Sequence, residues 1–252
     1  MHRFVLAREG EGGAAVGSRW ALGPEDSHHA ARVLRLGPGD EIEVLDGAGG
    51  ILACRVTGGG RRALEVEVVM ARRQAAPMPV ALAPALLKGR AMDFLIQKAT
   101  ELGATAITPL VTARTVARMP DGEAVARVAD WERTAREACK QCGNAWMPRL
   151  EAPRTLARFL SDAGDGLRVA AMLRREARWP GQVLDEAGAE VLAGPVTLMT
   201  GPEGDFTPEE ERALIDAGVQ PITLGPLVLR AETAVVAGLA VLQHERARRA
   251  GG

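Results

Sequence analysis

The sequence predicts an α/β protein with two parts: a small β domain up to residue 73, then a mainly parallel sheet covered by helices on both faces. Short runs that alternate apolar and polar residues dominate the first part, which is typical of half-buried strands. Residues 72–79 lack periodicity and carry two prolines, as a linker does. From residue 80 onward apolar runs alternate with helical periods, which indicates βαβ units.

In the first part we expect strands separated by glycine-containing turn signals at Asp46-Gly47 and Gly58-Gly-Gly60, with one helix between the amino terminus and the first strand. The strands are expected at Glu41–Leu45, Ile51–Val56 and Leu64–Val69, and the helix at His28–Leu34.

In the second part strands and helices are expected in alternation. The clearest helix start is Thr207, a good N-cap, followed by Pro208 at the first helical position and by Glu210, which completes a capping box. The strands are expected at Val80–Leu87, Ala106–Val111, Leu167–Leu173, Val196–Thr200 and Ile222–Leu224. The helices are expected at Asp93–Leu102, Ala124–Cys142, Gly181–Ala189, Pro208–Ala217 and Ala231–Arg249.

Two glycine loops lie where a ligand is expected. Gly201-Pro-Glu-Gly204 follows one apolar strand, and Gly225-Pro226 follows the next. Ligands of open parallel sheets bind beyond the carboxyl ends of the strands, and glycines there let backbone amides approach a ligand closely. Taken alone, the loops are equally consistent with tight turns that bind nothing. If they do bind, the two loops form one site.

Composition and charge are those of an ordinary globular chain, with 252 residues, 47% hydrophobic content and a net charge of -1. A net charge of -1 excludes RNA binding through the electrostatic field of the whole chain, so any RNA contact depends on local arginine clusters. No segment approaches the roughly 20 apolar residues of a membrane span, and the amino terminus has no signal-peptide pattern. The three cysteines lack a disulfide framework, which fits a reducing cytosol. We expect a cytoplasmic protein that does not contact a membrane.

Motif order and spacing exclude two other site types. A dinucleotide-binding fingerprint belongs after the first strand of a βαβ unit, whereas Gly201 and Gly204 lie in the last quarter of the chain. Cys139-x-x-Cys142 has no second cysteine pair and no histidine close in sequence. We therefore expect no metal site.

Ordered motifs across nearly the whole chain resemble those of the bacterial small-subunit (16S) ribosomal RNA uridine-N3 methyltransferases, in the SPOUT class of S-adenosylmethionine enzymes. The motifs are His29 with Val33-Leu-Arg35, Gln97–Gly103, Pro109 with Thr112–Thr115, Glu137–Gln141, Gly201–Gly204, and Leu224-Gly225 with Leu229–Ala234.

This resemblance implies a fold, an activity and partners. Residues 74–252 would form a SPOUT-type parallel sheet with a carboxyl-terminal trefoil knot, and residues 1–73 a PUA-like RNA-binding β-barrel. The enzyme would act as a homodimer and transfer a methyl group from S-adenosylmethionine to N3 of a specific uridine in 16S rRNA of the small ribosomal subunit. The residues implied around the cofactor are Leu173, Met199, Thr200, Gly201, Glu203, Gly204, Leu224, Gly225, Leu229 and Arg230.

Candidate catalytic residues follow from the chemistry of uridine N3, whose imide proton must leave while negative charge spreads to the two carbonyl oxygens. Arg230 is the first candidate to stabilise that charge, because a guanidinium stays protonated and donates two hydrogen bonds. Glu232 is the candidate base. The alternative for Glu232 is an acidic residue that stabilises the first turn of the last helix.

The resemblance also implies contacts with RNA. Arg32 and Arg35 with His29 would contact phosphates, although the solvated face of a helix is the alternative from the residues alone. Lys98 with Arg114 would form a wall of the uridine pocket, although Lys98 and Glu101 alternatively form a surface pair. The implied RNA-binding residues are Arg3, His29, Arg32, Arg35, Lys98, Arg114 and Gln141.

Two positions depart from the family pattern. The family usually carries arginine where this chain has Asn144, and more often glycine where it has Asp205. The first departure removes an implied substrate contact, for which Arg149 is a candidate substitute. The second leaves open an alternative function, that of a non-catalytic RNA-binding or ribosome-assembly protein on the same fold.

Overall fold

The computed structural model describes residues 1–6, 15–60, 62–117, 122–162, 164 and 166–250. The chain divides into two compact units. Unit 1 comprises Met1–Ala76 with Arg136–Met147, and unit 2 comprises Pro77–Ala135 with Pro148–Gly252. The domain boundary expected after residue 73 stays a prediction, and residues 136–147 cluster with the amino-terminal unit.

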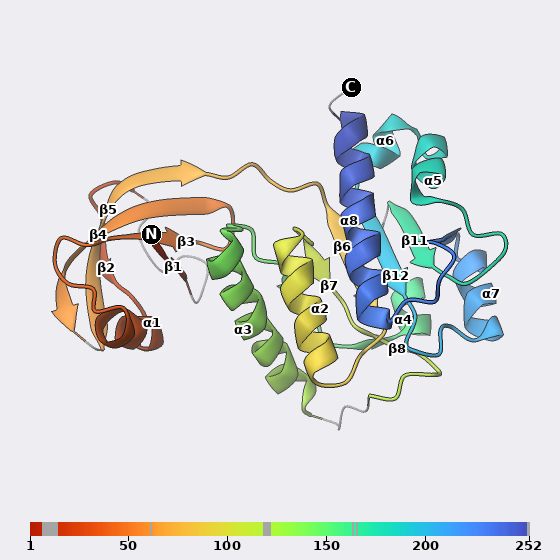
Figure 1. The fold of residues 1–252 in the computed structure, drawn as a ribbon, viewed down its shortest axis with the longest axis horizontal. Helices are drawn as coiled ribbons and strands as arrows, with labels where there is room; N and C mark the ends of the chain where they lie inside the picture. Colours follow the sequence, from red (N-terminus) through yellow and green to blue (C-terminus); the bar gives the residue numbers. More distant parts are fainter. Residues whose placement is uncertain (7–14, 61, 118–121, 163, 165, 251–252) are drawn as a thin grey trace. The chain divides into compact units, whose positions relative to one another are not determined.

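Unit 1 is built on a five-stranded sheet with the order β1-β3-β4-β5-β2. β1 pairs parallel with β3, and the other neighbours pair antiparallel. A short helix and a π-helical turn follow β2 (Figure 1). The strands are β1 (His2–Val5), β2 (Arg19–Ala21), β3 (Glu41–Leu45), β4 (Gly50–Gly60) and β5 (Ala63–Arg73), and the helical segments are α1 (Pro24–His28) and η1 (His29–Val33).

The strands expected in unit 1 are confirmed, with differences in length. β4 continues to Gly60, where the sequence predicted a break, because a register shift between Val56 and Gly58 lets the glycines keep pairing with β5. β1 and β2 were not predicted, since such short strands show no clear period. The helical segment begins at Pro24 rather than at His28.

The carboxyl-terminal end of α3 (Ala124–Cys142) packs within unit 1, where Cys139 is buried beside Val5, Leu45 and Ile51. Lys140 Nζ donates to Asp26 Oδ1 at 3.0 Å and to Glu137 Oε1 at 2.7 Å. The amphipathic period of α3 predicted the bounds of the helix correctly. It did not predict which sheet the last turns would cover.

Unit 2 contains a six-stranded sheet with the order β13-β11-β12-β6-β7-β9, and all its pairings are parallel. The predicted parallel sheet is therefore confirmed. A separate two-stranded sheet joins β8 to β10. The strands are β6 (Val80–Pro84), β7 (Ala106–Ile107), β8 (Leu110–Val111), β9 (Arg149–Leu150), β10 (Arg154–Thr155), β11 (Leu167–Ala171), β12 (Val196–Thr200) and β13 (Gln220–Ile222).

Helices cover both faces of the sheet in unit 2, as predicted. α8 lies across β12 and β6 and beside α2 (Figure 1), while α4 and α7 pack together on the other face. One predicted helix is wrong in its bounds, because Gly188 (φ 76°) separates two short helices in place of one. The helices are α2 (Arg90–Glu101), α3, α4 (Leu156–Ser161), α5 (Pro180–Glu186), α6 (Gly188–Ala193), α7 (Pro208–Asp216) and α8 (Ala231–Ala250).

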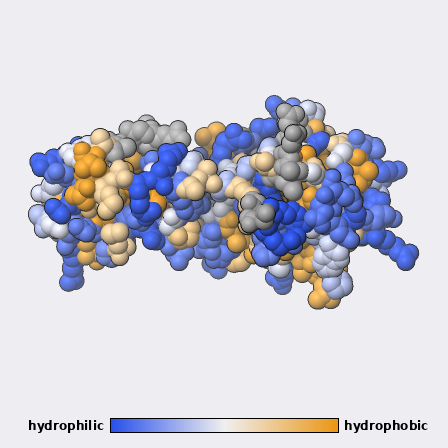
Figure 2. All heavy atoms as spheres, turned by 90° about the horizontal axis from the view of Figure 1, so that it is seen from above, coloured by the Kyte–Doolittle hydropathy of each residue, from blue (hydrophilic) through white to orange (hydrophobic). Residues whose placement is uncertain are grey.

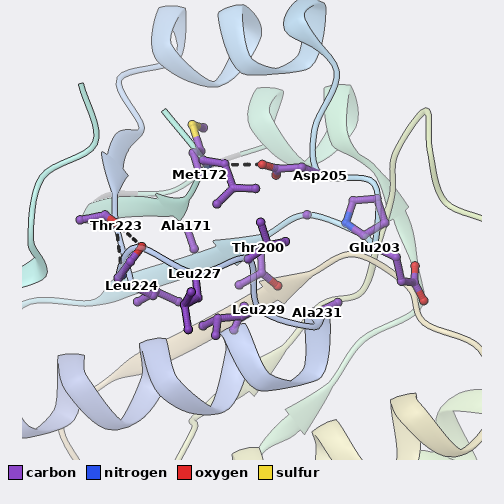
Figure 3. Close-up of a pocket in the computed structure, with 16 residues that line it drawn as sticks. Ala171, Met172, Thr200, Glu203, Asp205, Thr223, Leu224, Leu227, Leu229 and Ala231 are labelled. Atoms are coloured by element: carbon purple, nitrogen blue, oxygen red, sulfur yellow. Dashed lines mark hydrogen bonds between the residues drawn. The ribbon is translucent and has the colours of Figure 1, made fainter. Parts of the chain in front are cut away.

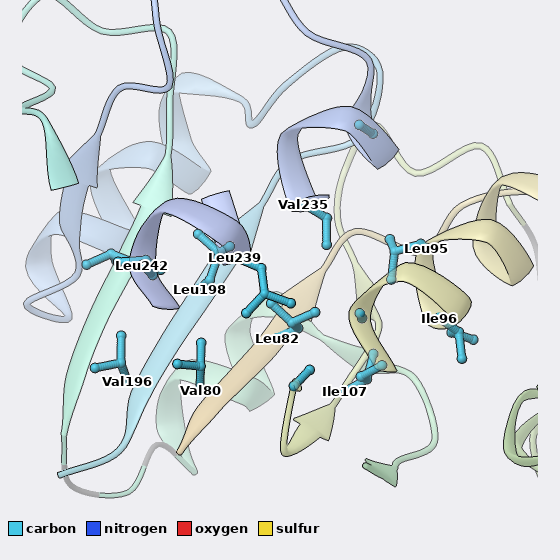
Figure 4. Packing of buried hydrophobic residues seen from close by; sticks show 14 of the residues in the cluster. Val80, Leu82, Leu95, Ile96, Ile107, Val196, Leu198, Val235, Leu239 and Leu242 are labelled. Atoms are coloured by element: carbon cyan, nitrogen blue, oxygen red, sulfur yellow. The ribbon is translucent and has the colours of Figure 1, made fainter. Parts of the chain in front are cut away.

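Strand residues alternate between the two cores of unit 2. Leu82 and Leu198 face α2 and α8 (Figure 4), whereas their neighbours Ala83 and Met199 face α4 and α7. Because both faces are buried, the strands read as continuous apolar runs. β13 lies two residues earlier than expected, since Thr223 and Leu224 leave the sheet to enter the following loop.

The described surface is mixed in character. Figure 2 shows hydrophilic residues interspersed with small, separate hydrophobic patches on the face that it presents. Among the described residues, no helix has the length and apolar character needed to cross a membrane.

Candidate functional site

A cavity with about 550 Å³ of empty space, partly open to solvent, lies at the carboxyl ends of β11 and β12 in unit 2 (Figure 3). This is the edge of the sheet at which a ligand site was predicted. Its lining comes from the end of β11, both glycine loops and the start of α8. The lining residues are Ala171–Leu173, Thr200–Glu203, Asp205, Thr223–Gly225, Leu227–Leu229, Ala231 and Ala234.

The first glycine loop is shaped by Gly201 and Asp205. A Cβ atom on Gly201 would lie 2.7 Å from Asp205 Oδ1 and 3.1 Å from Asp205 Cα, so the loop has room only for glycine there. Asp205 has a φ of 59°, in the left-handed region that favours glycine. Its Oδ1 accepts from Phe206 N at 2.8 Å and its Oδ2 from Leu173 N at 3.3 Å. The Asp205 side chain therefore ties the loop after β12 to the end of β11.

The predicted start of α7 is confirmed in detail. Thr207 Oγ1 accepts from Glu210 N at 3.2 Å, and Glu210 Oε2 accepts from Thr207 N at 3.0 Å. Glu210 Oε1 also accepts from Ala113 N at 2.7 Å. The capping box thus fastens the segment after β8 to the end of the first glycine loop.

The second glycine loop closes the cavity on the side of α8. Thr223 Oγ1 accepts from Gly225 N at 3.2 Å, and Gly225 has a φ of 128°. Leu227 and Val228 border the cavity while remaining 73% and 75% exposed. Two adjacent large apolar side chains therefore meet water at the edge of the cavity.

The chemistry of the lining suits a ligand with a flat apolar part and hydrogen-bonding groups. Met172, Leu224 and Leu229 supply apolar walls, and backbone groups of the loops supply hydrogen-bond partners. Within the described part of the chain, the buried Thr200 Oγ1 has no hydrogen-bond partner. A buried hydroxyl of this kind at a cavity wall is available to a bound ligand. These features fit S-adenosylmethionine, whose adenine needs apolar walls and hydrogen-bond partners.

Most of the residues predicted around a cofactor lie in this lining. They are Leu173, Thr200, Gly201, Glu203, Leu224, Gly225 and Leu229. Met199 instead is fully buried on the α4 and α7 face of the sheet. Gly204 and Arg230 are exposed and do not line the cavity.

Sequence reasoning missed several lining residues, among them Met172, Thr223 and the Leu227-Val228 pair. Leu227-Val228 carried a signal, since two apolar residues in a loop between Pro226 and Leu229 lack a core to enter. Asp205 was noted only as a departure from the family pattern. Because it lines the cavity and is held by two backbone donors, this departure leaves the pocket intact.

The structure brings Arg114 to the first glycine loop. Its Nη1 donates to Gly204 O and, at 3.3 Å, to Phe206 O. Arg230 and Glu232 lie at the start of α8, Arg230 exposed and Glu232 half-buried in the first turn. Lys98 Nζ lies 2.8 Å from Glu101 Oε1, which is the surface pair considered as the alternative.

Candidate RNA contacts in unit 1 gather on one helical segment. His29 and Arg32 are exposed on η1, and Arg35 follows it with a φ of 56°. Arg3 differs from them, because its Nε lies 2.7 Å from the buried carboxylate of Glu43.

Two further candidate positions lie near the end of α3. The Arg3 Nη1 donates to the backbone oxygen of Gln141 at 3.4 Å, and the Gln141 side chain is exposed. Asn144 Oδ1 accepts from Trp146 N at 2.9 Å, so this residue shapes the turn after α3.

The cysteines differ in exposure. Burial, together with nearby Cys142, raises the pKa of the Cys139 thiol to about 12. Burial raises the pKa of Cys54 to about 11, whereas Cys142 is exposed. The described residues contain no group of three or more His, Cys, Asp or Glu side chains placed to hold a metal ion.

Comparison with known proteins adds two family matches. The model described as an RNA methyltransferase domain matches residues 74–243, and the one described as an RNA methyltransferase PUA domain matches residues 22–69.

Individual relatives are similar over most of the chain. A ribosomal RNA small subunit methyltransferase E from Synechocystis sp. is 35% identical over 241 residues, which cover 95% of this chain and 76% of that protein. The protein of the same name from Mycobacterium bovis is 34% identical over 222 residues, covering 85% and 82%. A crystal structure of this type of enzyme from Neisseria gonorrhoeae, bound to S-adenosyl methionine, has a TM-score of 0.85 at 28% identity and covers 97% of each chain.

Proposed function

The chain belongs to the RNA methyltransferase family that includes the ribosomal RNA small subunit methyltransferases E, and we propose that it transfers the methyl group of S-adenosylmethionine to N3 of a specific uridine in 16S rRNA. The observation that carries this proposal is the cavity at the carboxyl ends of β11 and β12, with its apolar walls and the unpartnered Thr200 hydroxyl. The similar enzyme from Neisseria gonorrhoeae binds S-adenosyl methionine.

The cofactor, when bound, supplies an electrophilic methyl group. The protein must then lower the cost of removing the N3 proton and of spreading negative charge over the uracil carbonyls. We assign the second task to Arg230, an assignment supported by its place between Leu229 and Ala231, which both line the cavity. Its guanidinium donates two parallel hydrogen bonds to the developing charge. Glu232, one helical position beyond Ala231, accepts the N3 proton.

Unit 1 is proposed to hold the ribosomal RNA. His29, Arg32 and Arg35 are exposed on and beside one turn, where they can contact phosphates without a basic net charge on the whole chain. Arg114 and Lys98, in unit 2, and Arg3 and Gln141, in unit 1, complete the proposed set of RNA contacts. In this proposal residues 1–73 form the RNA-binding domain and residues 74–252 the catalytic one, in the cytoplasm.

A homodimer and a carboxyl-terminal trefoil knot are part of the same proposal. The exposed Leu227 and Val228 support the dimer, because a second copy would remove both side chains from water at the mouth of the cavity. Sedimentation of the protein with Leu227→Ser and Val228→Ser, beside the unchanged protein, tests this. A dimer of undiminished stability would show that these side chains lie outside the interface.

Mass spectrometry of 16S rRNA tests the function directly. Ribosomal RNA from cells that lack the gene should contain unmodified uridine at one position, and the wild-type gene should restore 3-methyluridine there. A Gly201→Val gene should not restore it, because a side chain at this position would collide with Asp205 and the Phe206 backbone and distort the loop that lines the cavity. Tight binding of S-adenosylmethionine to the purified protein, with unchanged rRNA in the deletion strain, would contradict the proposal.

A further inference from the structure

Resting on the proposed function, we infer that Asp205 makes the pocket select the charged form of the cofactor. S-adenosylmethionine carries a positive sulfonium, whereas S-adenosylhomocysteine, the product after methyl transfer, carries a neutral thioether. The two molecules are otherwise the same apart from the methyl group. A fixed negative charge in the lining therefore favours the substrate form and promotes release of the product form.

The Asp205 carboxylate is fixed in place by the backbone. Phe206 N donates to Oδ1 at 2.8 Å and Leu173 N to Oδ2 at 3.3 Å, so neither oxygen is free to turn away. Leu173 itself lines the cavity, and Phe206 follows the lining residue Asp205 in the sequence. Figure 3 shows Asp205 beside Met172, above Thr200. A charge held in this way is preorganised, because it does not reorient when a cation enters.

The rest of the lining contains little that would cancel this charge. Among the lining residues that the structure describes, Glu203 and Asp205 are acidic and none is Lys, Arg or His. Glu203 is exposed, whereas Asp205 is half-buried, so water screens Glu203 more.

Arg230, Arg114 and Arg174 lie near the lining without being part of it: Arg230 is exposed between Leu229 and Ala231, and the other two donate to acceptors other than Asp205. The Arg114 guanidinium donates to backbone oxygens of Gly204 and Phe206. Arg174 Nη1 lies 3.1 Å from Glu211 Oε2, and its Nε lies 3.4 Å from Glu176 Oε2. Asp205 is therefore the fixed, partly buried charge that a cationic ligand meets inside the cavity.

Asp205→Asn removes the charge with little change in side-chain size, and the comparison of cationic with neutral ligands separates the effect of the charge from that of the loop conformation. Asparagine has nearly the same size and shape and tolerates a positive φ better than most residues, and its single oxygen can keep one of the two backbone hydrogen bonds. The matched control is Asp216→Asn, which removes an exposed carboxylate at the end of α7, outside the lining. Asp205→Gly serves as a second variant that relieves the positive φ and also removes the charge.

Calorimetry at low salt should measure three ligands on each protein: S-adenosylmethionine, S-adenosylhomocysteine, and an analogue with a protonated amine in place of the sulfonium. Asp205→Asn should weaken the two cationic ligands about tenfold and change the neutral one by less than about twofold. The difference should shrink in 1 M salt if water reaches the site. Asp216→Asn should leave all three affinities unchanged.

Equal weakening of all three ligands by Asp205→Asn would show that Asp205 only shapes the loop and would overturn the inference. The same conclusion would follow if Asp205→Gly and Asp205→Asn left the preference for cationic ligands intact. If the wild-type protein bound none of the three, the failure would instead lie with the proposed function.

Discussion

At the scale of single residues, the first glycine loop requires glycine at position 201 but accepts aspartate at position 205. Gly201 is required because its missing side chain makes room for Asp205. Asp205 adopts a left-handed conformation that costs a non-glycine residue roughly 1–2 kcal/mol. The hydrogen bonds from Phe206 N and Leu173 N offset that cost. The cavity wall thereby carries an acidic side chain at a position whose backbone conformation favours glycine.

Arg230→Lys tests the proposed catalytic role, because it keeps the positive charge but loses the planar, two-pronged donor. If Arg230 stabilises charge on the uracil carbonyls, the single-turnover methylation rate should fall roughly 10²- to 10³-fold with RNA binding little changed. Rapid-quench kinetics at a series of 16S rRNA concentrations measures both. A rate within a few-fold of wild type would move the role to Glu232, Arg114 or Lys98.

Thiol alkylation tests the difference among the cysteines. At pH 8 a thiol with a pKa of about 12 has roughly one molecule in 10⁴ as the reactive thiolate, so Cys139 should stay unmodified in the folded protein. Cys54 is buried as well, whereas Cys142 is exposed and should react. Mass spectrometry after iodoacetamide treatment should find one label in native protein and three after unfolding in urea. Labelling of Cys139 before Cys142 would contradict the burial of this turn.

At the scale of elements, the pocket depends on how closely α8 approaches the sheet. Gly238 is buried in α8, and a Cβ atom there would lie 2.8 Å from Leu198 Cδ2 and 3.6 Å from Leu224 Cδ1. Leu198 belongs to β12 and Leu224 to the cavity lining. The helix, the central strand and the pocket wall therefore meet at this glycine.

Gly238→Val should destabilise the protein and weaken cofactor binding together. The added branches force apart α8 and β12, which costs about 1–3 kcal/mol, and they displace Leu224 from the pocket wall. Urea unfolding and calorimetry with S-adenosylmethionine measure the two effects. Thr233→Val, exposed on the same helix, controls for helix propensity and should change the free energy of unfolding by about 0.5 kcal/mol or less. Equal behaviour of the two variants would refute close packing at Gly238.

At the scale of the whole molecule, the net charge of -1 means that attraction to RNA has to come from local groups of arginines. Unit 1 presents Arg32 and Arg35 with His29 on a short exposed segment. Each phosphate contact made by such a group contributes to the salt dependence of binding.

Arg32→Ala combined with Arg35→Asn should weaken RNA binding and lower the slope of log affinity against log salt by about two units. Asparagine is chosen at position 35 because Arg35 has a φ of 56°. The control, Arg19→Ala with Arg55→Ala, removes the same amount of positive charge from β2 and β4 of unit 1. It should weaken RNA binding less. Cofactor affinity should stay unchanged in both. An unaltered slope would assign Arg32 and Arg35 to a solvated helix face.

The sequence by itself determined the features that depend on short stretches of chain. The bounds of β3, β12 and α3 follow from apolar periods that each element carries within itself. The capping box of Thr207 and Glu210 joins groups three residues apart, so it was predictable without knowledge of the fold. The parallel sheet and the place of the site at its carboxyl edge followed from the alternation of strands and helices.

Only the tertiary structure decided which of these residues meet. Met199 and Thr200 are adjacent in β12, but successive side chains of a strand point to opposite faces, so Thr200 lines the cavity and Met199 packs against α4 and α7. The contact between Asp205 and Leu173 joins loops after two different strands, and the end of α3 packs in unit 1. Such contacts depend on strand order and on the path of the chain between elements, and no local period encodes either.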